Sequence, residues 1–225
     1  MAPELDLFRK QFSSVRMGSF ELAAGSDPEL AIRLYDWNIQ IGGAVWEDLS
    51  VVEVLMRTAF DRVLQDRFDP EPWYGVNAAL WSEHYSFRDE AIRIARHDEG
   101  IDEDDRTDPS HDSVVAAMPF GIWRLFASKK YEDRVWSTLQ RAFRVSRLNR
   151  TLFEPRIVDL SDLRNDIAHH RPVFGWDFDN SYSNIKMIAG VISPEVQVWI
   201  TDRSRLPDML RDDPLGRPWK SARNA

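Results

Sequence analysis

The residues best suited to chemistry lie in one short stretch, LRNDIAHHRPVF, at positions 163–174. An arginine, an amide and two of the five histidines of the chain occur together there: Arg164, Asn165, His169 and His170. Arginine presents a planar, charged fork that matches phosphate oxygens and stabilises the extra negative charge of a pentacoordinate transition state. An unperturbed histidine titrates at about pH 6.5, so it can take a proton from a ribose 2′-OH or protonate a leaving 5′-oxygen. These side chains suffice for RNA cleavage without a metal or cofactor, and Asn165 could orient a histidine or a phosphate.

Helix geometry does not bring these side chains together on one straight helix. At about 100° per residue, His169 lies about 140° around the axis from Arg164, and His170 about 120° in the other direction. They would converge if the last turn unwinds before Pro172, or if two copies of the helix meet across a two-fold axis. The plainer interpretation is a pair of C-capping histidines and a surface arginine. From spacing alone, the two interpretations carry equal weight.

Other common chemical sites do not fit this sequence. Cysteine is absent, which excludes disulfides, zinc ribbons and thiol catalysis. No glycine-rich phosphate loop occurs, and no histidine pair has metal-ligand spacing, so no metal site is expected. The isolated His84, His97 and His111 are expected at the surface or in loops. Residues 98–112 hold eight acids and one arginine, which predicts a solvated acidic loop.

The composition indicates a folded chain. It has 225 residues, of which 43% are hydrophobic and 12% aromatic, far from the disordered class. No apolar run reaches the ~18 residues of a membrane span, and the N-terminal segment lacks a signal-peptide core, so a cytoplasmic protein without a membrane partner is expected. The net charge is -8, but the acidic loop accounts for -7 of it, and residues 124–150 carry +6. The basic segment is compatible with a path for a phosphate backbone, although solvated surface is the ordinary explanation.

The apolar spacing is helical almost throughout, and strand-like alternation is nearly absent. The first strong signal is Asp27 as an N-cap followed by Pro28, and Gly42-Gly43 is expected to interrupt or kink the helix that follows. Helices are predicted over 28–40, 45–68, 87–97, 113–118, 120–126, 130–143, 155–171, 183–192 and 194–204. We expect one all-α domain over 1–225, with a core at about 28–203, the acidic loop at about 98–112 and a polar tail at about 212–225.

The motif stretch resembles the Arg-x4-6-His motif of the HEPN superfamily, in particular its Abi-like (abortive infection) branch. Arg164, Asn165 and His169 match the arginine, the following polar residue and the histidine of that motif, and His170 matches a second histidine typical of the branch. Residues 35–64 resemble the early helix pair of the family, in which a Glu and an Arg four residues apart lie within an apolar face. Residues 114–136 resemble the segment before the motif helix. The resemblance covers about residues 30–200.

The resemblance implies an α-helical HEPN-type bundle with additional helices and a homodimer whose motifs face one another. It also implies a metal-independent endoribonuclease acting on RNA in phage defence, or as the toxin of a toxin-antitoxin pair with an antitoxin protein as partner. Arg164, His169 and His170 would then be catalytic. The chain departs from the usual branch pattern at Asp166 and Arg171, where acidic and basic residues are exchanged, which suggests a compensating swap of charge.

Glu53 and Arg57 allow two interpretations. At i and i+4 on a helix they form an ordinary salt bridge worth a few tenths of a kcal/mol. Because Glu53 lies at i+7 from Trp46 and at i-7 from Phe60, it could instead be partly buried, face the motif helix and orient Arg164 or a histidine.

Two further functions stay open beside the ribonuclease. One is a non-catalytic HEPN-fold module that binds RNA, a nucleotide or a protein partner. The other is a structural dimer subunit whose nine tryptophans serve only core and interface.

Overall fold

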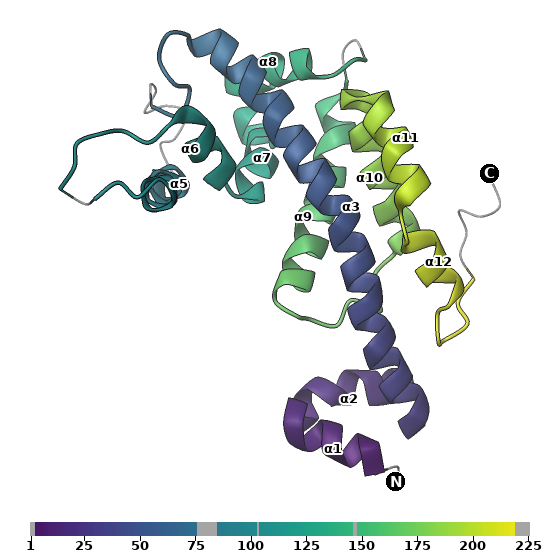
Figure 1. Cartoon of the computed structure of the whole chain (residues 1–225). Coiled ribbons are helices and arrows are strands. Elements are labelled where there is room, and N and C mark those ends of the chain that lie inside the picture. The colour runs from purple at the N-terminus through teal and green to yellow at the C-terminus, as the bar shows by residue number, and fades with distance from the viewer. Residues whose placement is uncertain (1–2, 76–84, 103, 146–147, 219–225) are drawn as a thin grey trace.

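The computed structural model describes residues 3–75, 85–102, 104–145 and 148–218, and these residues form helices joined by turns and loops with no strand among them (Figure 1). The all-α prediction is therefore confirmed. One long helix crosses the molecule diagonally, and the other helices pack along its length or at its two ends (Figure 1).

The long helix α3, Pro28–Phe68, is one uninterrupted element of 41 residues. The expected N-cap is present: the Asp27 carboxylate accepts from the amides of Glu29 at 2.9 Å and Leu30 at 3.1 Å. The predicted interruption at Gly42-Gly43 is wrong. Two glycines cost a helix about 2 kcal/mol in intrinsic propensity, and burial of the α3 face outweighs that cost. Gly42 is itself buried, and a Cβ built there would lie 3.8 Å from Cγ2 of Ile167.

Three later helices complete the main bundle: α9, α10 and α11, which span Arg150–Ala168, Phe178–Ile192 and Pro194–Arg203. Helix α9 begins five residues before the predicted start at Pro155, because the Asn149 side chain caps it by accepting from the amide of Thr151 at 2.9 Å. Helices α9 and α10 pack on α3 and on each other, and α11 packs antiparallel to α10 (Figure 1).

The segment between α7, Phe120–Phe126, and α9 is irregular, whereas the sequence predicted one helix over 130–143. It consists of a 3-10 turn, one π turn, the short α8 and a second 3-10 turn, with bounds Lys129–Tyr131, Glu132–Trp136, Ser137–Leu139 and Gln140–Ala142. The π turn turns Val135 and Trp136 into the core. Aromatic packing against Phe143 and Phe153, at centroid distances of 5.8 and 5.7 Å from Trp136, overrides regular helical spacing here.

The acidic loop joins α5, Tyr85–Asp98, to α6, His111–Ala117, beside the far end of α3 (Figure 1). Its side chains are mostly exposed, as predicted. Helix α5 begins two residues before the predicted start at residue 87, so Ser86 lies inside its first turn. The guanidinium of Arg96 organises the loop by donating to the carbonyls of Asp102, Asp105 and Thr107 at 2.6–2.7 Å.

Three helices were not expected: α1 and α2, Pro3–Phe12 and Ser14–Ala23, and α12, Leu206–Arg211. The first two form a hairpin against the N-terminal part of α3 (Figure 1). The first residues of the predicted polar tail, up to residue 218, contact the rest of the molecule: Arg217 lies over the Trp37 ring and Leu215 packs on the core. The rest of that tail, and His84, lie outside the described residues.

Candidate functional site

Arg164 faces α3 from the last turns of α9, with 33% of its side chain exposed. Its guanidinium carbon lies 5.2 Å from the centroid of the Trp46 ring, in a cation–π contact. Its Nε lies 3.9 Å from a carboxylate oxygen of Glu53, which is ion-pair distance but too long for a hydrogen bond. Helix α3 therefore fixes the position of the motif arginine through two side chains that lie about two turns apart on the same helix face.

Glu53 also pairs with Arg57, whose Nη2 donates to it at 3.0 Å. Only 17% of the Glu53 side chain is exposed. Both interpretations of this residue thus hold together, because the i,i+4 salt bridge exists and the same carboxylate faces the motif helix. We call Trp46, Glu53, Arg57 and Arg164 the Arg164 cluster.

The Arg164 cluster has more cationic than anionic charge. Two guanidinium groups share one carboxylate, which leaves one positive charge in excess. The Nε atoms of Arg57 and Arg164 are buried and have no hydrogen-bond partner within the described chain. Buried donors without partners are costly, and such sites are often functional. This arrangement favours an anionic ligand at the exposed edge of the cluster.

The end of α9 is closed by regular hydrogen bonds, so of the two ways in which the motif could converge, unwinding of the last turn before Pro172 is not observed. The amide of His170 donates to Ile167 and that of Arg171 to Asp166, at 2.9 and 2.8 Å, and His170 has a φ of 54°. These are the two hydrogen bonds and the left-handed residue of a Schellman motif. His169 is the C-cap residue, and the side chains of Asn165, His169 and His170 are exposed.

Asp166 and Arg171, the two exchanged positions, form an ion pair at 2.9 Å. The indole nitrogen of Trp176 donates to the same carboxylate at 3.2 Å. The expected compensation of charge is therefore present. It also ties the turn after α9 back to the helix, where it supports the left-handed conformation of His170.

One chain does not assemble Arg164, His169 and His170 into a single site. No hydrogen bond or cation–π contact among the described residues joins the arginine to either imidazole, and α9 keeps helical geometry through Ala168. Arg164 therefore faces α3, while His169 lies about 140° around the axis.

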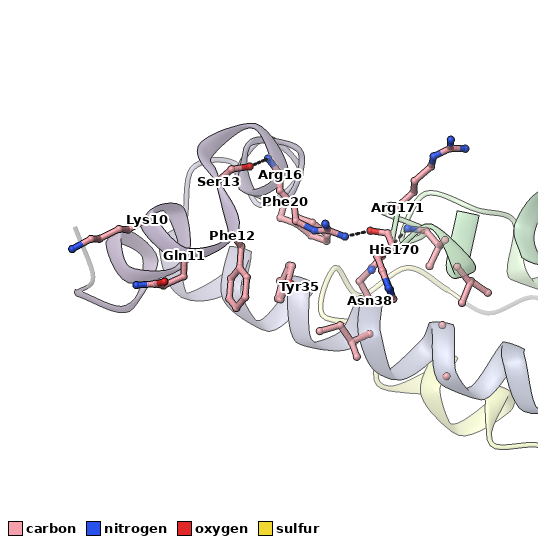
Figure 2. A pocket seen from close by; sticks show the side chains of 15 residues that line it. Lys10, Gln11, Phe12, Ser13, Arg16, Phe20, Tyr35, Asn38, His170 and Arg171 are labelled. Atoms are coloured by element: carbon pink, nitrogen blue, oxygen red, sulfur yellow. Dashed lines mark hydrogen bonds between the residues drawn. The ribbon is translucent and has the colours of Figure 1, made fainter. Parts of the chain in front are cut away.

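A cavity of about 720 Å³ opens beside the end of α9 (Figure 2). We call it the N-terminal groove, since the α1–α2 hairpin, the first half of α3 and the end of α9 enclose it. The Arg16 guanidinium crosses toward α9 and donates to the carbonyl of His170 (Figure 2). Asn38 accepts from the amides of Val173 and Phe174 at 2.7 and 3.0 Å, which fixes the segment after the motif against α3.

The residues of this groove on α1 and α2 were missed by the sequence reading. Lys10, Phe12 and Arg16 stand before the first helix that was predicted. The mixture of apolar and charged residues over ELDLFRKQF was a sequence signal for a helix here, but a helix this short gives only a weak signal. Those side chains line a groove only because the two helices pack against α3.

The other predicted features are ordinary in structure. His97 is exposed, and His111 lies at the start of α6 with its Nε2 2.9 Å from Asp61. In the basic segment, Arg124 pairs with Asp162 at 2.7 Å and Arg141 with Asp66 at 3.2 Å. Within the described residues no group of three side chains has the arrangement of a metal site.

Asp48, on the opposite face of α3, is the strongest electrostatic anomaly. It is 6% exposed, and burial raises its pKa from 3.8 to about 6, against the lowering effect of a hydrogen bond from Ser204 Oγ at 2.6 Å. Its neighbour Glu47 has a lowered pKa because Arg205 hydrogen-bonds to it. This group connects α3 to the α11–α12 joint and lies apart from the motif.

The fold and the Arg164 cluster define an all-helical protein with an anion-attracting site where two helices cross. Comparison of the chain with protein-family models, curated proteins and solved structures gives no match. None of the helices described is both long enough and apolar enough to cross a membrane.

Proposed function

We propose that the protein is a metal-independent endoribonuclease of the HEPN type, acting as a cytoplasmic homodimer in phage defence or as the toxin of a toxin-antitoxin pair. The observation that carries the proposal is the Arg164 cluster. A motif arginine with surplus positive charge and an exposed edge is suited to binding a phosphodiester.

The chemistry assigned to the motif is cleavage by attack of the ribose 2′-oxygen. A histidine removes the 2′-OH proton, the 2′-oxygen bonds to phosphorus, and Arg164 stabilises the charge that develops on the phosphoryl oxygens. A second histidine protonates the leaving 5′-oxygen as its bond to phosphorus breaks. The products are a 2′,3′-cyclic phosphate and a 5′-hydroxyl. His169 and His170 supply these two roles.

A second copy of the chain supports this chemistry better than one chain does. Beside Arg164, α3 exposes a strip of small and apolar residues at helical spacing: Ile39, Gly43, Trp46, Ser50 and Val54. Trp46 of this strip also contacts Arg164, and Ile39 and Gly43 border the N-terminal groove. Covering this strip with a two-fold copy would bury apolar area and bring the motif helices of two chains together. The histidine that one chain lacks beside its arginine then comes from its partner.

The activity is tested with purified protein and RNA in EDTA. We expect wild type to cleave and to leave cyclic phosphate ends, and Arg164→Ala and His169→Ala each to lose at least about 100-fold in rate. Arg156→Ala, on the same helix about two turns earlier, is the matched control and should cleave normally. Identical patterns from wild type and His169→Ala would refute the enzymatic proposal. Expression in cells adds a test of the toxin role, because lethality should disappear with Arg164→Ala.

The shared site is tested by mixing the two inactive variants. If each site takes its arginine from one chain and its histidine from the other, half of the dimers in an equal mixture are mixed, and half of their sites are intact. The mixture should therefore recover about one quarter of wild-type activity. A mixture that stays inactive although subunits exchange would place both residues in one chain.

The alternative is a non-catalytic module of the same fold that binds RNA, a nucleotide or a protein. The separation of Arg164 from both imidazoles within one chain favours it. Binding of RNA without turnover, unchanged by His169→Ala, would decide for it.

A further inference from the structure

The N-terminal groove is large enough for a small ligand, since sites for such ligands have volumes of about 300–1,000 Å³ and this cavity has about 720 Å³. It is also well fixed. Phe20 of α2 packs on Phe174 at a centroid distance of 5.1 Å, and Arg16 is tethered to the His170 carbonyl. The hairpin that forms one wall is therefore held against the segment that forms the other.

The charge of the groove is opposite to that of the chain. Lys10, Arg16 and Arg171 line it, whereas none of the residues lining it is an Asp or Glu, although the chain carries -8 overall. Arg171 stands at the rim and extends away from the centre, paired with Asp166 (Figure 2). Arg16 lies at the centre and has five N–H donors, of which its contact with His170 uses one. The groove therefore attracts an anion and can donate several hydrogen bonds to it.

An aromatic surface adjoins these cations. Phe12 stacks on Tyr35 with ring centroids 5.6 Å apart and an angle of 22°, and it is 44% exposed. The edges of Phe8 and Phe20 pack against Tyr35 at 5.7 and 5.2 Å and hold it in place. A fixed, exposed phenyl ring next to arginine and lysine is the arrangement on which nucleic-acid bases stack.

Two amides add polar selectivity. The oxygen of Asn38 is used by the backbone of Val173 and Phe174, but its nitrogen has no partner in the described part of the chain. The side chain of Gln11 is exposed at the mouth. Both can hydrogen-bond to a sugar or to the edge of a base.

We propose that the N-terminal groove binds a nucleoside phosphate, with the phosphate on Arg16 and Lys10 and the base stacked on Phe12. The ligand chemistry is the same for a free nucleotide and for a terminal nucleotide of an RNA strand. Because Ile167 and His170 of the motif helix also line the groove, a bound strand would lie beside the motif. The proposal concerns binding alone and does not depend on cleavage.

The test is titration calorimetry on the full chain with three kinds of probe. Inorganic phosphate reports on the cations alone, nucleoside mono-, di- and triphosphates report on the free ligand, and 2′-O-methyl RNA with a 5′-phosphate reports on the strand. The 2′-O-methyl probe cannot be cut by 2′-oxygen attack, so its binding is measured whether or not the protein is a ribonuclease.

We expect a nucleotide or the RNA probe to bind at least tenfold more tightly than phosphate, and the tighter of the two identifies the source. Phe12→Ala should weaken that binding about fivefold or more without changing phosphate binding. Lys10→Gln and Arg16→Ala should weaken both. The matched controls are Arg33→Ala on α3 and Leu22→Ala on α2, which are exposed but do not line the cavity.

Three results would overturn the proposal. The first is absence of binding by every nucleotide and by the RNA probe. The second is equal affinity for phosphate and nucleotides. The third is binding that Phe12→Ala and Lys10→Gln leave unchanged; both residues are exposed, so these variants remain informative if Arg16→Ala fails to fold.

Discussion

The Arg164 cluster and the N-terminal groove lie against the same end of α9 but differ in how their cations are held. In the cluster, Glu53 lies against both arginines, and the Nε atoms of both are buried. In the groove no carboxylate is among the lining residues, and the central cation is fixed by a backbone carbonyl. A carboxylate orients a guanidinium but also neutralises its charge and competes with a phosphate for it. A neutral carbonyl orients the guanidinium without neutralising its positive charge. The first arrangement suits a positioned catalytic group and the second suits binding.

The largest expected effect distinguishes the Arg164 cluster from the N-terminal groove, because cleavage reports on the first and nucleotide affinity on the second. Arg164→Ala should lower RNA cleavage by 10²–10³-fold, about 3–4 kcal/mol of transition-state stabilisation, since one positioned donor is lost. Nucleotide affinity in the groove should stay within twofold of wild type by calorimetry. Phe12→Ala should show the reverse, with weaker binding and normal cleavage of a dinucleotide. If both variants lose both properties, the two regions are one site.

Activity or binding measured against pH in either region must first be corrected for the effect of Asp48 on the stability of the fold. Because its pKa is raised to about 6 in the folded protein, its protonation stabilises the fold below pH 4, and this stabilisation is lost as pH rises through 6. A shift of this size is worth roughly 2–3 kcal/mol. The free energy of unfolding of Asp48→Asn, measured by chemical denaturation, should therefore increase relative to that of wild type when the pH is raised from 4.5 to 7.5. An equal difference at both pH values would contradict the assignment.

Asn38 offers a way to break the groove while leaving the Arg164 cluster alone. Asn38→Ala leaves the amides of Val173 and Phe174 without their acceptor, so it should cost about 1–3 kcal/mol of stability by thermal or chemical unfolding. Asn38→Asp keeps the acceptor but places a negative charge in the groove. It should therefore preserve stability and weaken nucleotide binding several-fold. Unchanged affinity in a folded Asn38→Asp protein would contradict the electrostatic account of the groove.

The smallest effect is expected at Glu53. Glu53→Gln removes a half-buried charge from between Arg57 and Arg164, and we expect a loss of under about 1 kcal/mol in stability. Cleavage should fall only a few-fold, since Trp46 still holds the Arg164 guanidinium. Glu53→Ala removes the hydrogen-bonding group as well, so its rate of RNA cleavage should be lower than that of Glu53→Gln. Kinetic assays compare the two variants. A stronger loss in Glu53→Gln than in Arg164→Ala would make Glu53 the principal residue of the cluster.

The sequence predicted the fold class and much of the Arg164 cluster for different reasons. Helices with strong caps and regular apolar spacing, such as the one begun by Asp27, were placed well because these signals are local. For Glu53 the sequence left two interpretations open, a salt bridge with Arg57 or a position facing the motif helix, and the structure shows both contacts. The irregular 129–142 segment was missed, since burial of Trp136 and its aromatic neighbours decides its backbone.

What the sequence alone determined is therefore the helical character of the chain and the chemical types gathered in LRNDIAHHRPVF. The helical character follows from local interactions between residues a few positions apart, and the residue types are read directly from the sequence. The tertiary structure decided that α3 continues through Gly42, where burial outweighs the cost of glycine, and that α9 ends in a Schellman turn supported by Asp166 and Arg171. It also decided the groove, because Arg16 and His170, 154 residues apart in sequence, meet only when α2 and α9 both pack on α3.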